Sequence, residues 1–123
     1  MSRAVVPPGW PRLVLPPAVP GWEESAGAWL LDLCPPDYRG YPVLRRHPVV
    51  LARFAALHIE AARAGVRRGL SEARAVLRDV ADATTVDQAV HAWQAEEARL
   101  LAESRAVSLV EEALRGKRFV ARL

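Results

Sequence analysis

The stretch from Thr85 to Arg115, TVDQAVHAWQAEEARLLAESRAVSLVEEALR, decides the fold class of this 123-residue chain. It contains no proline and no glycine, and its apolar residues recur with helical spacing. One set repeats every seven residues and forms a continuous ridge: Val86, Trp93, Leu100, Val107 and Leu114. Thr85 and Gln88 have the spacing of a capping box, and Gly116 is a typical C-terminal stop. The stretch therefore predicts one helix of about 30 residues, roughly 45 Å long.

The opposite side of this predicted helix carries a second apolar stripe, made mostly of small residues. The candidate partner surface on this alanine stripe is Ala95, Ala98, Ala102, Ala106 and Leu109. A helix that is apolar on two opposite faces usually packs on both of them. We expect the heptad ridge to face the rest of the bundle. The alanine stripe is then covered by the N-terminal strap (residues 1–22), by the short helix expected over 23–33 or by another chain, and the sequence leaves all three open.

Two shorter helices are expected before the long one. Pro48 suits a first helical turn and Gly69 a helix end, so the first helix is predicted over 48–68. Ser71 has the character of an N-cap, so the second is predicted over 71–82. Their expected buried face includes Leu51, Phe54, Ala55, His58, Ala73, Val76 and Val80.

The N-terminal residues 1–22 contain six prolines and two tryptophans, so neither a helix nor a central strand is expected there. We predict an extended strap whose tryptophans dock between helices. Two PxxP spacings leave a polyproline ligand as the alternative. A short helix is expected to follow over 23–33.

The predicted fold class is all-α. It is a small helical bundle with one long C-terminal helix packed antiparallel to two shorter helices. The predicted organisation is a single domain in which the strap, residues 1–22, docks on the bundle, residues 23–123.

Charge is segregated along the chain, although the net charge is only +3. Residues 38–78 hold nine arginines and two glutamates, a charge of +7, whereas residues 79–114 hold eight acids and two arginines, a charge of −6. The arginines of the 48–68 helix lie opposite its apolar face, so we expect them to point outward, away from the acidic helix. Guanidinium groups bind phosphate oxygens bidentately. The candidate nucleic-acid or anion face is Arg46, Arg53, Arg63, Arg67 and Arg68.

The turn before Pro48 concentrates polar and aromatic side chains and is the candidate small-molecule loop. Its residues are Asp37, Tyr38, Arg39 and Tyr41. The sequence has no glycine-rich phosphate loop, no nucleophile elbow and no metal-ligand spacing, so no catalytic residue, cofactor or metal is expected. Adjacent carboxylates on a helix, such as Glu96 and Glu97, point about 100° apart and do not converge as an acid/base pair. We expect a protein that is not an enzyme.

The cytoplasm is the expected location. Cys34 is the only cysteine, no secretion signal is recognisable, and no apolar run is long enough to span a bilayer. Surplus apolar surface on the long helix favours a non-catalytic protein–protein interaction or adaptor module, with a homodimer as one form of it. The alternative is an RNA- or DNA-binding protein that uses the arginine face and the basic C-terminal tail. No membrane partner is expected.

Overall fold

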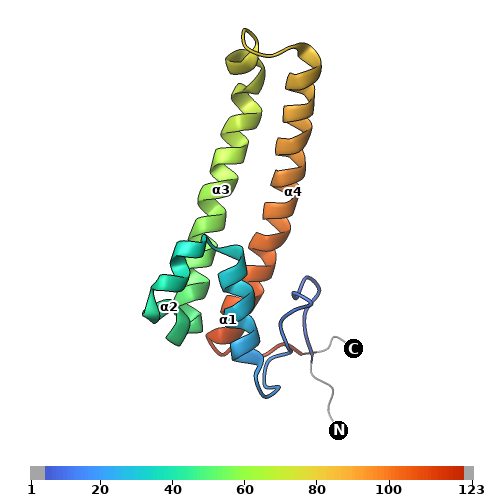
Figure 1. Cartoon of the computed structure of the whole chain (residues 1–123). Coiled ribbons are helices and arrows are strands. Elements are labelled where there is room, and N and C mark those ends of the chain that lie inside the picture. The colour runs from blue at the N-terminus through green and yellow to red at the C-terminus, as the bar shows by residue number, and fades with distance from the viewer. Residues whose placement is uncertain (1–4, 121–123) are drawn as a thin grey trace. The chain divides into compact units, whose positions relative to one another are not determined.

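A computed structural model describes residues 5–120, and their regular secondary structure is entirely helical. The elements are α1 (Trp22–Leu33), the 3₁₀-helix η1 (Pro36–Gly40), α2 (Pro42–Arg46), α3 (Pro48–Leu77) and α4 (Ala83–Leu114). The two long helices, α3 and α4, pack against each other (Figure 1). The all-α prediction is confirmed for this part of the chain. None of the described helices is both long and apolar enough to cross a membrane.

The chain forms two compact units. The first unit combines the chain up to His58 with the part from Arg105 onward, and the second unit is Ile59–Ser104. Both α3 and α4 therefore contribute residues to each unit. The predicted boundary after residue 22 lies inside the first unit.

The core of the first unit is made by apolar side chains from all four α-helices. Its largest fully buried members are Leu30, Leu44, Leu51, Val107 and Val110. Burying each of these side chains contributes about 1.5–3 kcal/mol relative to leaving it exposed. In this unit α1 and α2 lie alongside the first turns of α3 (Figure 1). The side chain of Leu44 thus anchors the segment between α1 and α3 in this core.

The predicted break between residues 68 and 71 is wrong, because α3 is one continuous helix of 30 residues. Gly69 lies inside it, where a Cβ atom would come within 2.5 Å of Cε2 of Trp93. Ser71 is not an N-cap, since its hydroxyl donates to the carbonyl of Arg68 at 3.0 Å, one turn earlier. Gly69 therefore gives the indole of Trp93 room against α3 and does not end the helix.

The buried face of α3 also differs from the predicted one. Its buried residues include Leu51, Ala55, Ile59, Val66 and Ala73. On α3, Phe54 and Val76 are exposed, by 43% and 64%, and Val80, which was predicted on the same face, lies beyond the end of the helix and is 77% exposed. The buried stripe follows the four-residue steps from Leu51 to Ala55 to Ile59, so Leu51 and Ala55 are buried as predicted, whereas Phe54 lies beside the stripe.

The two ends of α4 have different caps. The helix begins at Ala83, and the Oδ1 atom of Asp82 accepts a hydrogen bond from the backbone N–H of Thr85 at 2.7 Å. Asp82, and not Thr85 as predicted, is therefore the N-cap. At the other end, Gly116 has φ +101°, its N–H donates to Ala113 O, and the N–H of Lys117 donates to Glu112 O. This Schellman arrangement confirms Gly116 as the stop.

The N-terminal segment folds into a series of tight turns and is not extended as predicted. Backbone hydrogen bonds close four successive turns: Trp10 N to Pro7 O, Val14 N to Pro11 O, Val19 N to Pro16 O, and Trp22 N to Val19 O. Gly9 and Gly21 have φ +91° and +85°, as the third residue of a type II turn requires. Pro8 and Pro20 precede these glycines and favour the turn. Because each turn reverses the chain, the segment does not form an extended polyproline helix at these positions.

Candidate functional site

The segment between α1 and α3 builds the most distinctive surface of the first unit. Pro36 starts η1 and Pro42 starts α2, each at a position where a missing N–H costs nothing. The N–H of Tyr38 donates to Pro35 O at 3.0 Å, and that of Tyr41 donates to Tyr38 O at 3.1 Å. These turns set both tyrosines close to the first turns of α3.

Tyr38 lies at the centre of an aromatic cluster. Its ring centroid is 6.3 Å from that of Tyr41, 5.8 Å from Phe54 and 6.1 Å from His58. The contacts with Phe54 and His58 are edge-to-face, the geometry that the ring quadrupoles favour. The structure thus joins Tyr38 and Tyr41 of the predicted loop to α3.

Much of this cluster faces solvent. Tyr41 is 52% exposed, Phe54 43% and Leu57 56%. Leu57 lies three residues after Phe54, so both side chains lie on the same side of α3. We call these residues the aromatic patch: Tyr38, Tyr41, Phe54, Leu57 and His58. Sequence reasoning missed Phe54 and Leu57 as surface residues; the four-residue steps of the buried stripe were the available signal.

A pocket of about 590 Å³ opens beside the patch and is lined by Arg39, Gly40, Pro42, Arg45 and Arg46. We call it the arginine pocket. Arg39 is held by Asp32, with Nη2 2.6 Å from Oδ1. Arg45 and Arg46 are exposed and form no ion pair with any residue between 5 and 120. Arg39 of the predicted loop and Arg46 of the predicted arginine face are therefore brought together, and Arg45 joins them.

The same three arginines also line a second hollow of about 450 Å³. Its other lining residues are Glu23, Glu24, Gly27, Ala28, Leu31, Leu44, Pro48 and Leu51. The hollow thus offers positive charge, an apolar wall and two carboxylates. Asp37 of the predicted loop is exposed and lines neither hollow.

Most of the predicted arginine face is occupied by acids of the same chain. Arg53 Nε lies 3.1 Å from Glu111 Oε2, and Arg67 Nε lies 3.6 Å from Glu97 Oε1. Arg68 pairs with Glu72 along α3. The expectation that these arginines point away from the acidic helix is wrong for Arg53 and Arg67. Long guanidinium side chains reach sideways to α4 although their Cα atoms lie off the buried face.

Arg63 differs from its neighbours in α3. Its Nε atom is buried and has no hydrogen-bond partner among the described residues. The five arginines that the sequence grouped together therefore do not act alike, and only Arg46 lines the arginine pocket.

The alanine stripe of α4 is divided between the two units. In the second unit Ala95, Ala98 and Ala102 are exposed. In the first unit Ala106 is 8% exposed and Leu109 is half-buried, with its Cδ1 atom 3.6 Å from the position of a Cβ on Gly9. The N-terminal segment therefore contacts the stripe at Leu109.

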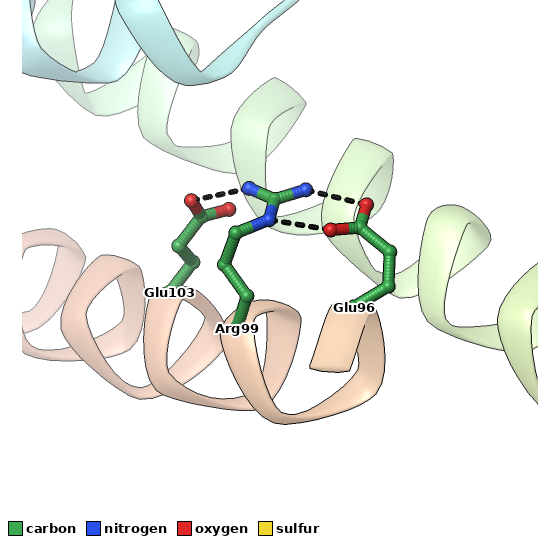
Figure 2. Close-up of polar contacts among 3 residues, drawn as sticks. All are labelled: Glu96, Arg99 and Glu103. Carbon is green, nitrogen blue, oxygen red and sulfur yellow. Dashed lines mark hydrogen bonds and ion pairs between the residues drawn. The ribbon is translucent and has the colours of Figure 1, made fainter. Parts of the chain in front are cut away.

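The acids of α4 in the second unit are partly neutralised within the helix. Figure 2 shows the guanidinium of Arg99 between the carboxylates of Glu96 and Glu103. Its Nε and Nη2 donate to Glu96 and its Nη1 to Glu103, all at 2.7 Å. Hydrogen bonding from Arg99 lowers the pKa of Glu96, and the bond to Glu96 raises the pKa of Arg99. Both carboxylates are thus held as ion-pair partners.

Cys34 follows α1 and is buried, and desolvation raises the pKa of its thiol to about 11. Within residues 5–120 no three side chains of histidine, cysteine, aspartate or glutamate gather in a way that could hold a metal ion. Comparison of the chain with protein-family models, curated proteins and solved structures finds no match.

Proposed function

We propose that the protein is a non-catalytic protein–protein interaction module whose first unit contacts its partner through the aromatic patch. The observation that carries the proposal is the exposure of Tyr41, Phe54 and Leu57 around a Tyr38 that is held by edge-to-face contacts. Contiguous exposed apolar side chains on a small domain mark interaction sites.

The residue types of the patch support this proposal. Tyrosine and phenylalanine are enriched at the centres of interfaces, where they combine a large apolar area with few rotatable bonds. The contacts of Tyr38 with three rings restrict the patch before binding. The side chains of the patch would then lose less conformational entropy on association than freely rotating side chains would.

Self-association is the second form of the proposal, and the exposed alanines of the second unit are its surface. Small side chains let two helices approach closely, and Ala95, Ala98 and Ala102 recur at helical spacing on one side of α4. In this form a second copy of the chain is the partner.

We infer the following architecture for the module. The pairing of Arg67 with Glu97 and of Arg74 with Asp87 supports an antiparallel α3 and α4, since higher residue numbers on one helix meet lower numbers on the other. Trp10 packs on Trp22 and Phe119, with ring centroids 6.4 and 5.9 Å apart, which supports the N-terminal segment as a strap.

RNA or DNA binding is the alternative function, and it has less support. Arg53 and Arg67 are engaged by glutamates of α4, so a phosphate backbone would compete with those ion pairs. We propose a cytoplasmic location, which the single, free and buried cysteine supports, since a free thiol suits a reducing compartment.

A pull-down from lysate of the native host, with one half treated with nuclease and the other half untreated, tests the proposed function. The baits are the full chain, the variant Phe54→Gln/Leu57→Gln, and the control Val76→Gln/Val80→Gln, which removes similarly exposed apolar side chains from a different part of the chain. We expect the full chain and the control to retain the same partner and the patch variant to lose it. Equal thermal unfolding of the three baits excludes a folding defect.

Loss of every partner on nuclease treatment would contradict the proposal and favour the nucleic-acid alternative. Retention of the partner by the patch variant would remove the aromatic patch as the contact surface.

A further inference from the structure

We propose that the arginine pocket binds the phosphate group of a small-molecule phosphate monoester. Arg39, Arg45 and Arg46 line the pocket together with Gly40 and Pro42, and no carboxylate of residues 5–120 lines it. Guanidinium groups match phosphate oxygens with paired N–H donors, and several of them around one hollow favour an anion with more than one charge.

The charge balance around the pocket selects the class of anion. Asp32 lies 2.6 Å from Arg39 and offsets its charge. Arg45 and Arg46 have no ion-pair partner in the described part of the chain, so about two positive charges are unpaired within the arginine pocket itself, while Glu23 and Glu24 line only the adjoining hollow. A phosphate monoester carries about −1.5 to −2 at pH 7, whereas a carboxylate or a phosphodiester carries one negative charge. The pocket therefore matches a monoester best.

The backbone that carries these arginines is fixed by local structure. Pro42 sets the first residue of α2, and the buried side chain of Leu44 anchors this short helix in the core. Arg39 is oriented by its ion pair with Asp32. The backbone of α2 and the side chain of Arg39 are thus positioned before a ligand arrives, which reduces the conformational entropy lost on binding.

The adjoining hollow has room for the organic group that the phosphate is attached to. It shares all three arginines and continues past the exposed Ala28 and the half-buried Leu31 to Glu23 and Glu24. Its volume of about 450 Å³ lies in the range of small-molecule sites. An organic group would lie on Ala28 and Leu31, and its hydroxyl or amino groups would donate to the two glutamates. These two carboxylates would repel the neighbouring phosphates of a nucleic acid, which favours a single phosphate group.

Two-dimensional ¹H–¹⁵N NMR of the full chain tests this site, with phenyl phosphate, methyl phosphate and dimethyl phosphate as probes at matched ionic strength. We expect saturable shifts confined to the backbone amides of Gly40, Arg45, Arg46 and their neighbours. Methyl phosphate should bind more tightly than dimethyl phosphate because of its second charge, and phenyl phosphate more tightly than methyl phosphate because of the apolar wall.

The variant Arg45→Gln/Arg46→Gln should weaken phenyl phosphate binding at least tenfold, as expected for removal of two charge-assisted contacts of about 1.4 kcal/mol or more in total. Arg105→Gln is the matched control, because Arg105 is also an exposed arginine of the first unit, and it should bind like the natural chain. Phe54→Gln/Leu57→Gln should also bind normally, since this site does not depend on the aromatic patch.

Three results would overturn the proposal. The first is the absence of saturable shifts at Gly40, Arg45 and Arg46 with phenyl phosphate. The second is an affinity unchanged by Arg45→Gln/Arg46→Gln. The third is tighter binding of a single-stranded oligonucleotide than of phenyl phosphate at these amides, which would identify a polymer phosphate as the ligand.

Discussion

The indole of Trp93 fills the space that a side chain at position 69 would need. A Cβ atom placed on Gly69 would lie 2.5 Å from Cε2, 2.7 Å from Nε1 and 2.9 Å from Cζ2 of Trp93. At such distances either the indole or the backbone of α3 would have to shift to admit a side chain. The close packing of α3 and α4 in the second unit therefore depends on the absence of a side chain at one residue.

Gly69→Ala should lower the free energy of unfolding by about 1–3 kcal/mol, the usual cost of overpacking. Gly65→Ala is the matched control on the same helix, because a Cβ there meets nothing within 4 Å. This control should raise stability by up to about 1 kcal/mol through helix propensity. Urea unfolding of both variants measures the two effects. A stabilising Gly69→Ala would show that the indole moves aside at little cost.

Asp82→Ala should lower the melting temperature by several degrees, because Asp82 is the N-cap of α4. Hydrogen bonds from the backbone N–H and the hydroxyl of Thr85 lower the pKa of Asp82 below its usual value. The cap therefore contributes its full stability above the unfolded pKa, about 3.9, and loses it as the pH falls through the lower folded pKa.

Asp82→Asn keeps a capping side chain but removes this pH dependence. Thermal unfolding between pH 2 and pH 6 should give a flatter curve for Asp82→Asn than for the natural chain. Thr84→Ala serves as the control at a neighbouring exposed position. If the curves of Asp82→Asn and the natural chain coincide, the carboxylate does not contribute through this titration.

Ala98→Arg and Ala106→Arg should differ in their effect, although both residues belong to the alanine stripe. Ala98 is exposed, so an arginine there should leave the fold intact and disrupt only self-association. Ala106 is 8% exposed, and an arginine there should cost several kcal/mol by overpacking and burial of a charge. Sedimentation velocity and urea unfolding separate the two outcomes. An unfolded Ala98→Arg would place that alanine in a core.

Arg53→Met should destabilise the first unit by about 1–3 kcal/mol, because it leaves the carboxylate of Glu111 with fewer partners in a poorly solvated position. Glu111 is 9% exposed and also pairs with Arg115, 3.2 Å away. Adding Glu111→Gln to Arg53→Met should recover part of the loss. A double-mutant cycle measured by urea unfolding gives the coupling free energy between Arg53 and Glu111. Additive effects of the two substitutions would mean that the ion pair contributes nothing to stability.

The helical content and the stop at Gly116 could be predicted from the sequence, because both depend on local spacing and backbone chemistry. The continuity of α3 could not. Gly69 followed by Ser71 has the local chemistry of a helix boundary, and only the position of Trp93, 24 residues further along the chain, gives the glycine its actual role. Local propensity was overridden by a contact between segments that are distant in the sequence.

The candidate sites show the same division. Arg39 and Arg46 were recognised separately, as members of a loop and of a helix face, and their meeting in one pocket depends on the short helix α2. The exposure of Phe54 follows from a buried stripe that runs through Leu51, Ala55 and Ile59, which counting apolar positions did not resolve. Residue types indicated the chemistry, whereas the three-dimensional arrangement decided which groups share a surface.

The burial of Cys34 makes this chain suitable for site-specific labelling. A thiol reacts with alkylating reagents as its thiolate, and with a pKa of about 11 very little of the Cys34 thiolate exists at neutral pH. A cysteine introduced at an exposed position, such as Ala98→Cys or Arg45→Cys, would react first. Fluorophores or spin labels can then be placed on the alanine stripe or the arginine pocket, one at a time, while every native core residue is kept.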